Sequence, residues 1–431
     1  MVSLRYLSVS FAIIAALSIN LVLSQDFQNT TYVASFTSSA DIGPLSVTTY
    51  FSPDTSIQTE TNLVINAVSS IDIAIPSFSS WAYCSSTYNG VYGCTVKDQR
   101  TTETFPIFNA LLNAIHRGVT VRILTNNYYS QNQTLTTGYI DPISFLAVAG
   151  AQVKYFTTLT FLHSKYMSID GKIVSISSIN YSKTSFMKNR EAGVIVEGAP
   201  PIVDFTTSVF EYDWNMGIAW PTLTYSSSDM KIIKDKSNID VVIPPATSFP
   251  GSFVTTAQTT TGDINALVFT SPDNAWDIVT SDIHNSKTLK VYIYQITNSD
   301  WCDLLGNYTG KLTILVSNKI FSYTDYLSAL ACYKHLNAAG ITIRKTNANM
   351  YTYSHQKFWI LDDDRVYVST GNWGDTDYPS GSQTFPPYDQ DPSQWRKTNR
   401  DFTIKMQDSG VTSIYSTLFD EDYERGYDWS P

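Results

Sequence analysis

The stretch Phe161-Leu-His-Ser-Lys-Tyr-Met-Ser-Ile-Asp170 has a counterpart in the second half of the chain, Ser354-His-Gln-Lys-Phe-Trp-Ile-Leu-Asp362. Both contain the pattern H-x-K-x-x-x-x-D. The chain has only five histidines, and chance would not be expected to place two of them in one eight-residue pattern. A repeated His/Lys pair indicates a site built from two halves, with two imidazoles and two ammoniums around one anionic group.

The regions around the two clusters are also repeated, in the same order and with similar spacing. Single matches of this length would be weak evidence, but several in register indicate an internal duplication. The matched segments are 50–54 with 269–273, 118–126 with 310–318, 149–155 with 339–345, 189–191 with 399–401, and 210–214 with 419–423.

Each half alternates apolar strands with helical stretches, so we expect an α/β fold with a largely parallel sheet that helices cover on both faces. Residues 108–116 and 326–336 have helical periodicity, and Gly118 and Gly340 follow them as end signals. The segment 222–261 is rich in Ser and Pro and reads as a linker. We therefore expect an N-terminal lobe over 25–221 and a C-terminal lobe over 262–431.

The composition favours a secreted globular protein. The net charge of −10 argues against a broadly basic nucleic-acid surface, although it allows a small positive pocket. Residues 1–24 have one basic residue, a mostly apolar run, and small residues before Gln25, which is typical of a cleaved signal peptide. The alternative is an uncleaved membrane anchor. We expect secretion or delivery to an endolysosomal lumen.

An oxidising compartment fits the four cysteines. Three pairings are open, and we expect one disulfide within each half, Cys84–Cys94 and Cys302–Cys332. Glycosylation sequons occur at Asn29, Asn132 and Asn307, and a fourth occurs at Asn180. Because a glycan on Asn180 would block the predicted site, we expect Asn180 to be unmodified, which glycopeptide mapping can check.

Local geometry places further polar residues beside the histidines. His163 and Lys165 are two residues apart on an expected strand and project together, as do His355 and Lys357. A two-residue hairpin turn at Asp170-Gly171 would pair Lys165 with Ile176 and His163 with Ser178. A turn at Asp363-Asp364 would set His355 beside Asn372. Ser178, Asn180, Thr370 and Asn372 are therefore expected near the histidines.

These residue types suit metal-free attack on a phosphodiester. Lysines and asparagines can bind the anionic oxygens, one neutral imidazole can attack phosphorus, and the other can protonate the leaving oxygen. Glu191 and Asp401 are expected to fix the tautomers of the two rings. Asp170 and Asp362 complete the repeated pattern and belong to the candidate catalytic set, although a turn aspartate usually has a structural role.

The duplicated H-x-K-x4-D pattern, with Ser177-Ser-Ile-Asn180 and Thr370-Gly-Asn-Trp373 after the two copies, resembles the phospholipase D superfamily. The first of these trailing elements departs from the family's usual G-S-x-N. The resemblance covers about residues 48–429. Within the family, the chain is similar to the short secreted or lumenal eukaryotic members. It implies two α/β/α lobes with the active site between them, a phosphohistidine intermediate, and neither metal nor cofactor. On this analogy His163 is the nucleophile and His355 the general acid, although the pseudo-symmetry leaves the two roles interchangeable.

Three functions stay open at this stage. The first is phospholipase D activity on phospholipids such as phosphatidylcholine, with transient contact to a membrane surface. The second is a lumenal 5′ exonuclease on single-stranded DNA or RNA, which needs a positive groove with stacking aromatics. Candidate groove residues are Lys183, Lys188, Arg190, Arg396, Lys397 and Arg400. Trp373 and Trp395 either line a substrate channel or pack in the core or at its rim. The third is an inactive secreted binding protein. The sequence does not give the oligomeric state.

Overall fold

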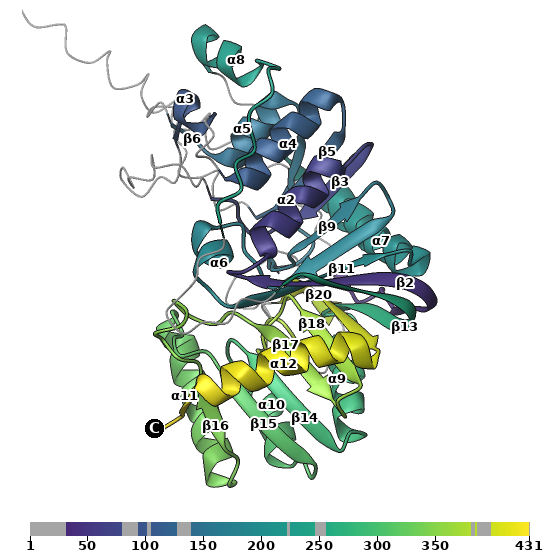
Figure 1. Ribbon diagram of the computed structural model, residues 1–431, viewed down its shortest axis with the longest axis vertical. Coiled ribbons are helices and arrows are strands. Elements are labelled where there is room, and N and C mark those ends of the chain that lie inside the picture. Colours follow the sequence, from purple (N-terminus) through teal and green to yellow (C-terminus); the bar gives the residue numbers. More distant parts are fainter. Residues whose placement is uncertain are drawn as a thin grey trace, which may run out of the picture.

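The computed structural model describes residues 32–79, 94–100, 105–126, 139–221, 225–245, 256–380, 384–385 and 398–430. Two α/β lobes lie one above the other, and long strands run between them (Figure 1). The predicted signal peptide, Cys84, Asn29, Asn132 and Trp395 lie outside the described residues, together with Arg396 and Lys397. Within the described part of the chain, no helix has the length and apolar character needed to cross a membrane.

The duplication is visible in the order of the strands, because both lobes use the same order and meet through their longest strands. Strands β2 and β13 pair antiparallel from Ser39↔Val268 to Thr49↔Gln258. Outward from this pair, the N-terminal lobe contains β2 (Ser39–Ser52), β11 (Glu191–Glu197), β10 (Ile173–Ser177), β9 (Tyr166–Ile169), β3 (Ser70–Ala74), β5 (Thr120–Thr125), β7 (Gln152–Tyr155) and β12 (Ile218–Ala219). The C-terminal lobe contains β13 (Gln258–Ser271), β20 (Asn399–Gln407), β18 (Arg365–Ser369), β17 (Lys357–Leu361), β14 (Thr288–Ile293), β15 (Lys311–Val316), β16 (Ile343–Lys345) and β21 (Tyr427–Asp428).

The α/β class and the two repeated lobes are confirmed, but the expected share of parallel strands was too high. Parallel pairing joins β3, β5 and β7 in one lobe and β14, β15 and β16 in the other, where helices provide the crossovers. The motif strands β9–β10 and β17–β18 are hairpins and therefore antiparallel. Hairpins and the long central pair make most of the pairing antiparallel.

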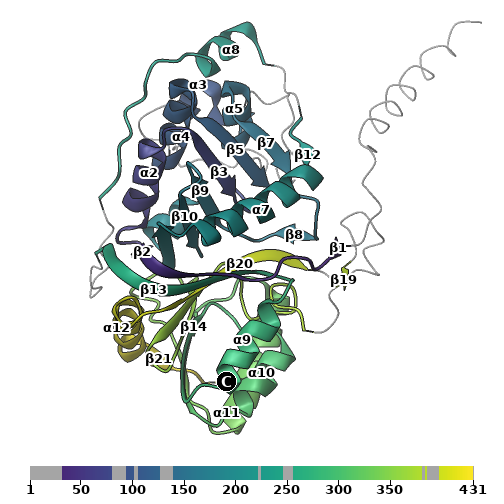
Figure 2. The same ribbon diagram turned by 90° about the vertical axis from the view of Figure 1, so that its right-hand side faces the viewer.

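Helices cover each sheet on both faces. Figure 2 shows the central strands β2, β13 and β20 between the helices of the N-terminal lobe and those of the C-terminal lobe. Helices α7 (Pro200–Met216) and α12 (Ser409–Arg425) contribute Phe210 and Phe419 to one core cluster that both lobes share. The outer faces are covered by α2 (Ser56–Asn66), α4 (Pro106–Arg117) and α5 (Pro142–Ala149) in one lobe, and by α9 (Ala275–His284), α10 (Ser299–Gly306) and α11 (Tyr323–Ala338) in the other. The remaining short elements are β1 (Tyr32–Val33), β4 (Cys94–Thr95), α3 (Val96–Gln99), β6 (Tyr139–Ile140), β8 (Phe161–Leu162), α6 (Lys183–Met187), α8 (Ser227–Ile233) and β19 (Thr384–Phe385).

The described part of the expected linker is packed against the N-terminal lobe. Ile233 of α8 is fully buried in that lobe's outer core. Asp235 forms an ion pair with Arg100, and the backbone of Ile239 exchanges hydrogen bonds with Asn113. At the other end of the segment, β13 begins at Gln258, which is before the expected start of the second lobe.

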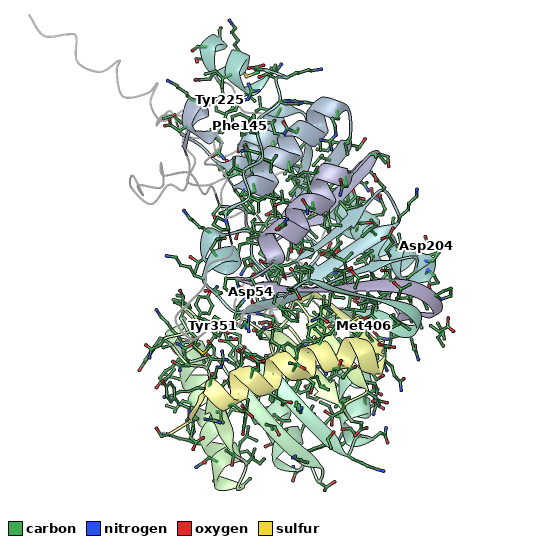
Figure 3. All side chains as sticks on the ribbon, viewed as in Figure 1. Asp54, Phe145, Asp204, Tyr225, Tyr351 and Met406 are labelled. Carbon is green, nitrogen blue, oxygen red and sulfur yellow. A yellow bond between two sulfur atoms is a disulfide. The ribbon has the colours of Figure 1, made fainter. Side chains whose placement is uncertain are left out.

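Two buried arginines tie each lobe to the inner helix of the other. Arg190 binds Asp54 of its own lobe at 2.9 Å and Asp422 of α12 at 2.9 Å. Its guanidinium also lies 4.8 Å from the ring centre of Tyr351, and Figure 3 labels Asp54 and Tyr351 at the junction of the lobes. The repeated Asn-Arg-acid segments are thus explained in part by packing between the lobes.

Arg400 repeats this arrangement with the lobes exchanged. It binds Asp273 of its own lobe at 2.8 Å and Asp213 of α7 at 2.9 Å. Neither Arg190 nor Arg400 has an exposed side chain, so neither can line a nucleic-acid groove as the sequence reading suggested. Trp373 is likewise a core residue, fully buried and stacked on Trp301 at 4.4 Å between ring centres.

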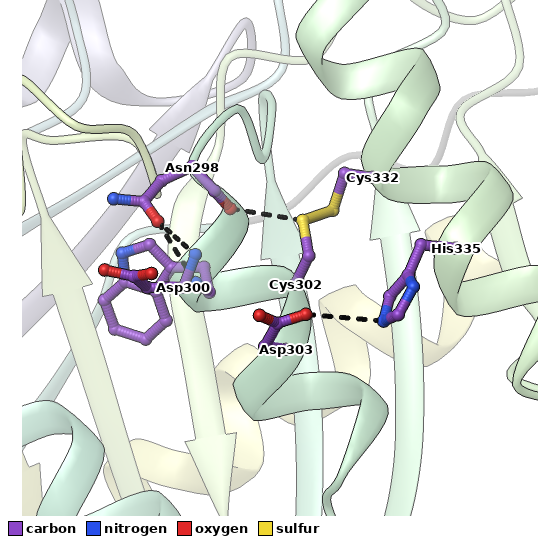
Figure 4. Close-up of a disulfide and its surroundings, with 7 residues drawn as sticks. Asn298, Asp300, Cys302, Asp303, Cys332 and His335 are labelled. Carbon is purple, nitrogen blue, oxygen red and sulfur yellow. Dashed lines mark hydrogen bonds and ion pairs between the residues drawn. A yellow bond between two sulfur atoms is a disulfide. The ribbon is translucent and has the colours of Figure 1, made fainter.

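The predicted disulfide of the second half is present. Cys302 of α10 and Cys332 of α11 are bonded, with their Cα atoms 5.6 Å apart, and Figure 4 shows the bond between the two helices. It fixes α11 to the body of the C-terminal lobe. The predicted Cys84–Cys94 bridge stays a prediction, because Cys84 lies outside the described residues.

Candidate active site

The backbone of each motif histidine is held by the opposite lobe. The N–H of His163 donates to the carbonyl oxygen of Arg400 at 3.0 Å, and the N–H of His355 donates to that of Arg190 at 2.8 Å. Each of these arginines is also one of the buried residues that tie the lobes together. The position of both histidines therefore depends on correct docking of the two lobes.

The histidine side chains cross the junction in the same way. Nδ1 of His163 lies 2.9 Å from Oδ1 of Asp401, and Nδ1 of His355 lies 2.9 Å from Oε2 of Glu191. Each carboxylate comes from the other lobe and is fully buried. A carboxylate on Nδ1 favours the tautomer that carries its proton there, so Nε2 of each ring is left as the nitrogen that can meet a substrate.

The hydroxyl residues expected near the site orient these carboxylates. Oγ of Ser178 donates to Oε2 of Glu191 at 2.8 Å, and Oγ1 of Thr370 donates to Oδ1 of Asp401 at 2.6 Å. The two lobes therefore contain matching hydroxyl–carboxylate–imidazole series. Sequence reasoning named all of these residues, but it did not determine which acid faces which ring.

Both motif lysines are buried beside their own histidines. Nζ of Lys357 donates to the carbonyl oxygen of His355 at 3.0 Å, and Nζ of Lys165 donates to that of His163. Burial lowers the pKa of Lys165 to about 8, against the opposing effect of Asp401. Burial and the charge of Lys165 lower the pKa of Lys357 to about 7. Lys165 therefore lies close enough to lower the pKa of Lys357, as expected for two cations that share an anion site.

The two asparagines expected in the site differ in their surroundings. Asn372 is buried, and its Nδ2 and backbone N–H both donate to Oδ2 of Asp377, at 3.0 and 2.7 Å. Asn180 is partly exposed, and its carbonyl oxygen accepts from the N–H of Ser182.

The predicted hairpin register is wrong by one residue in both lobes. Ile176 pairs with Tyr166, and Val368 pairs with Phe358. Both turns have three residues between the paired positions, where the prediction assumed two, and Asp170 and Gly171 take positive φ angles of 55° and 61°. The shift still leaves Ser178 beside the site, because its backbone N–H donates to the carbonyl oxygen of Ala192, next to Glu191.

Asp170 and Asp362 do not join the histidines, which corrects their place in the candidate catalytic set. The carboxylate of Asp170 accepts from the backbone N–H groups of Val68, Ser69 and Ser70. That of Asp362 accepts from the N–H groups of Lys287 and Thr288, at 2.7 and 3.0 Å. Each aspartate fixes its hairpin turn to the start of a neighbouring strand, at the far end of the hairpin from the lysine.

Burial lowers the pKa of both imidazoles. Burial lowers the pKa of His355 to about 4, although Glu191 opposes this shift. Burial, followed by the charge of Lys165, lowers the pKa of His163 well below its usual range. Lys357 and His355 add to the lowering of the His163 pKa, so the two halves of the site lie within electrostatic reach of each other.

We expect kcat/KM to follow a bell-shaped pH profile with its maximum on the acidic side of neutrality. The acid limb comes from protonation of the attacking imidazole. The alkaline limb comes from loss of the proton on the other imidazole and of the Lys357 charge, whose pKa is about 7. Initial rates on a soluble phosphodiester from about pH 4 to about pH 9 measure this. Rates that keep rising to the alkaline end would contradict it.

One group in the site has the geometry of a cation site. Donor atoms of His163, Asp377 and Asp401 lie within 4.8 Å of one another. The carboxylates, however, already accept from Thr370, Asn372 and Asn399, and the positive charges of Lys165 and Lys357 lie nearby. These donors and charges leave little need for a metal ion.

Comparison with known proteins agrees with this geometry. Residues 62–214 match the family model described as cardiolipin synthase, PLD-like domain. Phospholipase D Z of Dictyostelium discoideum is 22% identical over 400 residues, which cover 85% of this chain and 84% of that protein. Mitochondrial cardiolipin hydrolase of Mus musculus is 32% identical over 82 residues, 19% of this chain and 34% of that protein.

A solved structure supports the fold across both lobes. Phosphatidylserine synthase of Haemophilus influenzae covers 90% of this chain and 90% of its own, with 10% identity and a TM-score of 0.55. Of these relatives, phospholipase D Z matches enough of the chain to include both motif copies. The chain is thus similar to members of the phospholipase D superfamily. Its relatives are named a phospholipase D and a cardiolipin hydrolase, which supports a phosphodiester hydrolase activity.

Sequence reasoning missed Asp377, which lies beside the site. Oδ2 of Asp377 lies 3.6 Å from Nδ1 of His163, and its other oxygen accepts from Nδ2 of Asn399 at 2.5 Å. Counting from the matched asparagines, Asn180 and Asn372, the first lobe has Ser185 at this position. A search for matched residues therefore could not find it. The one feature of the sequence that points to Asp377 is its position shortly after Gly371-Asn-Trp-Gly, the segment that follows the second motif.

A second missed residue is Glu60 of α2. It is buried, accepts from Oη of Tyr50 at 2.9 Å, and lines a small cavity together with Lys165. Burial raises the pKa of Glu60 to about 7. The second lobe has Val279 at the equivalent distance from its Ser-Pro-Asp segment. Glu60 and Asp377 thus make the surroundings of the two histidines unequal in an otherwise symmetric site.

Proposed function

We propose that this protein is a phospholipase D that hydrolyses membrane phospholipids such as phosphatidylcholine to phosphatidic acid and the free head group. The observation that supports the proposal best is the crossed pair of imidazole–carboxylate contacts with two buried lysines beside them. This arrangement supplies two imidazoles of opposite role and a positive pocket for one phosphate.

The reaction takes two steps. Nε2 of His163 attacks phosphorus and forms a P–N bond, while the P–O bond to the head group breaks and His355 gives its proton to the leaving oxygen. In the second step, His355 takes a proton from water, and the oxygen of that water displaces His163 from phosphorus. Lys165 and Lys357 bind the phosphate oxygens throughout, and Asp401 and Glu191 hold the rings in place.

Several observations favour a lipid over a nucleic acid as substrate. The chain carries a net charge of −10, and two of the candidate groove cations, Arg190 and Arg400, are buried in ion pairs. The relative that matches most of this chain is named a phospholipase D. We also propose that residues 1–24 direct the protein into the secretory pathway, a view that the Cys302–Cys332 disulfide supports.

A side-by-side assay tests the substrate. Choline release from phosphatidylcholine vesicles is measured against shortening of a labelled single-stranded oligonucleotide, at acidic and at neutral pH. The proposal expects choline release that requires His163. Oligonucleotide shortening without choline release would favour the 5′ exonuclease, and turnover of neither substrate would favour the binding protein.

We expect activity to survive an excess of EDTA, because the lysines and imidazoles supply the charge that a metal would otherwise supply. The measurement is the choline-release rate before and after chelation, with Asp377→Asn as a companion variant. Loss of activity that added divalent ion restores would contradict the metal-free mechanism and would point to the His163, Asp377 and Asp401 cluster.

A further inference from the structure

Exposed apolar side chains gather at the start of α11. Of the eleven large hydrophobic residues that are exposed in the described part of the chain, four lie in one short segment. They are Phe321, Tyr323, Tyr326 and Leu327, exposed by 58%, 73%, 45% and 45%. We call these four residues the aromatic patch. Scattered exposed apolar residues need no explanation, but a local concentration marks a contact surface.

The patch is held in a fixed position. Tyr323, Tyr326 and Leu327 share one face of α11, since they are spaced three and four residues apart. Beyond its first turn the helix is buried through Ala329, Tyr333 and Leu336, and the Cys302–Cys332 disulfide fixes it to α10 (Figure 4). The apolar side chains are thus exposed on a rigid element.

A continuous series of aromatic rings joins the patch to the catalytic centre. The ring of Phe321 packs edge-on against Tyr353 at 4.8 Å, and Tyr353 lies 6.1 Å from the ring of His355. Tyr294 lies 5.1 Å from the same histidine ring, and its Oη accepts from the backbone N–H of Phe321 at 3.1 Å. A surface that meets the patch at Phe321 is therefore separated from the ring of His355 by Tyr353 and Tyr294.

The residue types fit a membrane surface better than a nucleic acid. Tyrosine rings prefer the head-group region of a bilayer, and Leu327 adds aliphatic surface that a base would not use. Lys319, with Nζ 4.4 Å from the ring centre of Phe321, adds a cation that suits lipid phosphates. A binding track for a nucleic acid needs several cations. Among the described residues of this segment, 319–327, the charged side chains are one cation, Lys319, and one anion, Asp325, which accepts a hydrogen bond from Gln295.

We propose that the aromatic patch docks this protein on the surface of a phospholipid bilayer, with the opening of the active site facing the head groups. This inference rests on the proposed lipid substrate and adds how that substrate is reached. Docking converts the search for a substrate from three dimensions to two. It explains how an acidic protein can act at a membrane: apolar contact supplies the affinity.

The test compares a patch variant with a matched control. The variant Y323S/Y326S/L327S removes exposed side chains only and leaves Phe321, which contacts Tyr353, in place. The control I42S/V68S removes two side chains that are exposed by 74% and 77% and lie on the N-terminal lobe. Both are assayed as full chains for co-sedimentation with phosphatidylcholine vesicles. Choline release is measured from the same vesicles and from a short-chain phosphatidylcholine kept below its micelle concentration.

The patch variant is expected to bind vesicles about tenfold more weakly or worse and to release choline from them in proportion. Its rate on the monomeric lipid is expected to stay at the wild-type value, and the control is expected to match wild type in every assay. If the patch variant binds vesicles as well as wild type does, the inference is overturned. It is also overturned if the variant keeps vesicle binding but loses oligonucleotide binding or self-association. If wild type binds vesicles through the patch but hydrolyses neither lipid, the proposed function fails and the docking surface stands.

Discussion

Replacement of His163 by asparagine is expected to reduce turnover by roughly four orders of magnitude or more, because it removes the nucleophile and not only a contact. Asparagine can still accept or donate a hydrogen bond, so the fold and the position of Asp401 should be kept. The measurement is the initial rate of choline release at the pH optimum, with circular dichroism to compare the folds. His355→Asn should have an effect of similar size, through loss of the proton donor.

The control is His284→Asn, which changes an exposed histidine in the last turn of α9. It should leave the rate at the wild-type value. Wild-type enzyme quenched in alkali during turnover should carry the phosphatidyl group on His163, and peptide mapping reads this directly. The phosphatidyl group on His355, with a comparable loss in both variants, would reverse the two roles while keeping the two-step mechanism.

Replacement of Arg400 by methionine is expected to lower the free energy of unfolding by roughly 3–5 kcal/mol. The methionine fills much of the space of the guanidinium but leaves the buried carboxylates of Asp213 and Asp273 without their cation. The carbonyl oxygen of Arg400 also accepts a hydrogen bond from the backbone N–H of His163. Activity should therefore fall as well, because looser docking of the lobes displaces His163. Urea denaturation followed by fluorescence measures the stability change.

Arg425→Met is the matched control for this variant. Arg425 lies 3.9 Å from Glu421 on the surface of α12, and both side chains are more than a third exposed. An exposed pair of this kind contributes about 0–1 kcal/mol, so the unfolding curve should barely move. Equal shifts in the two variants would mean that the buried ion pairs do not hold the lobes together.

The repeat made most of the site predictable from the sequence. The histidines, the lysines, Glu191 and Asp401 were each found because they occur in pairs at matched positions. The pairing across the junction was not predictable, since the choice between a carboxylate of the same lobe and one of the other lobe depends on how the lobes dock. The same limit applies to Arg190 and Arg400, which read as surface cations until their partners on α7 and α12 are seen.

Other errors arose where local rules compete. Asp-Gly at 170–171 is a strong signal for a two-residue turn, but the carboxylate of Asp170 binds three backbone N–H groups of a neighbouring segment and favours a wider loop. Asp377 and Glu60 have no matching acid in the other half, so a search for symmetry passed over both. Such unmatched residues are the ones that distinguish the two imidazoles chemically.

The exchange of carboxylates between lobes has a consequence for the newly made chain. While the first lobe folds during synthesis, His163 has no Asp401 beside it, and the second half has yet to emerge. Activity is therefore expected only after the whole chain has been made and the two lobes have docked. A chain that lacks the second lobe is therefore expected to be inert, because His163 has no carboxylate partner in it.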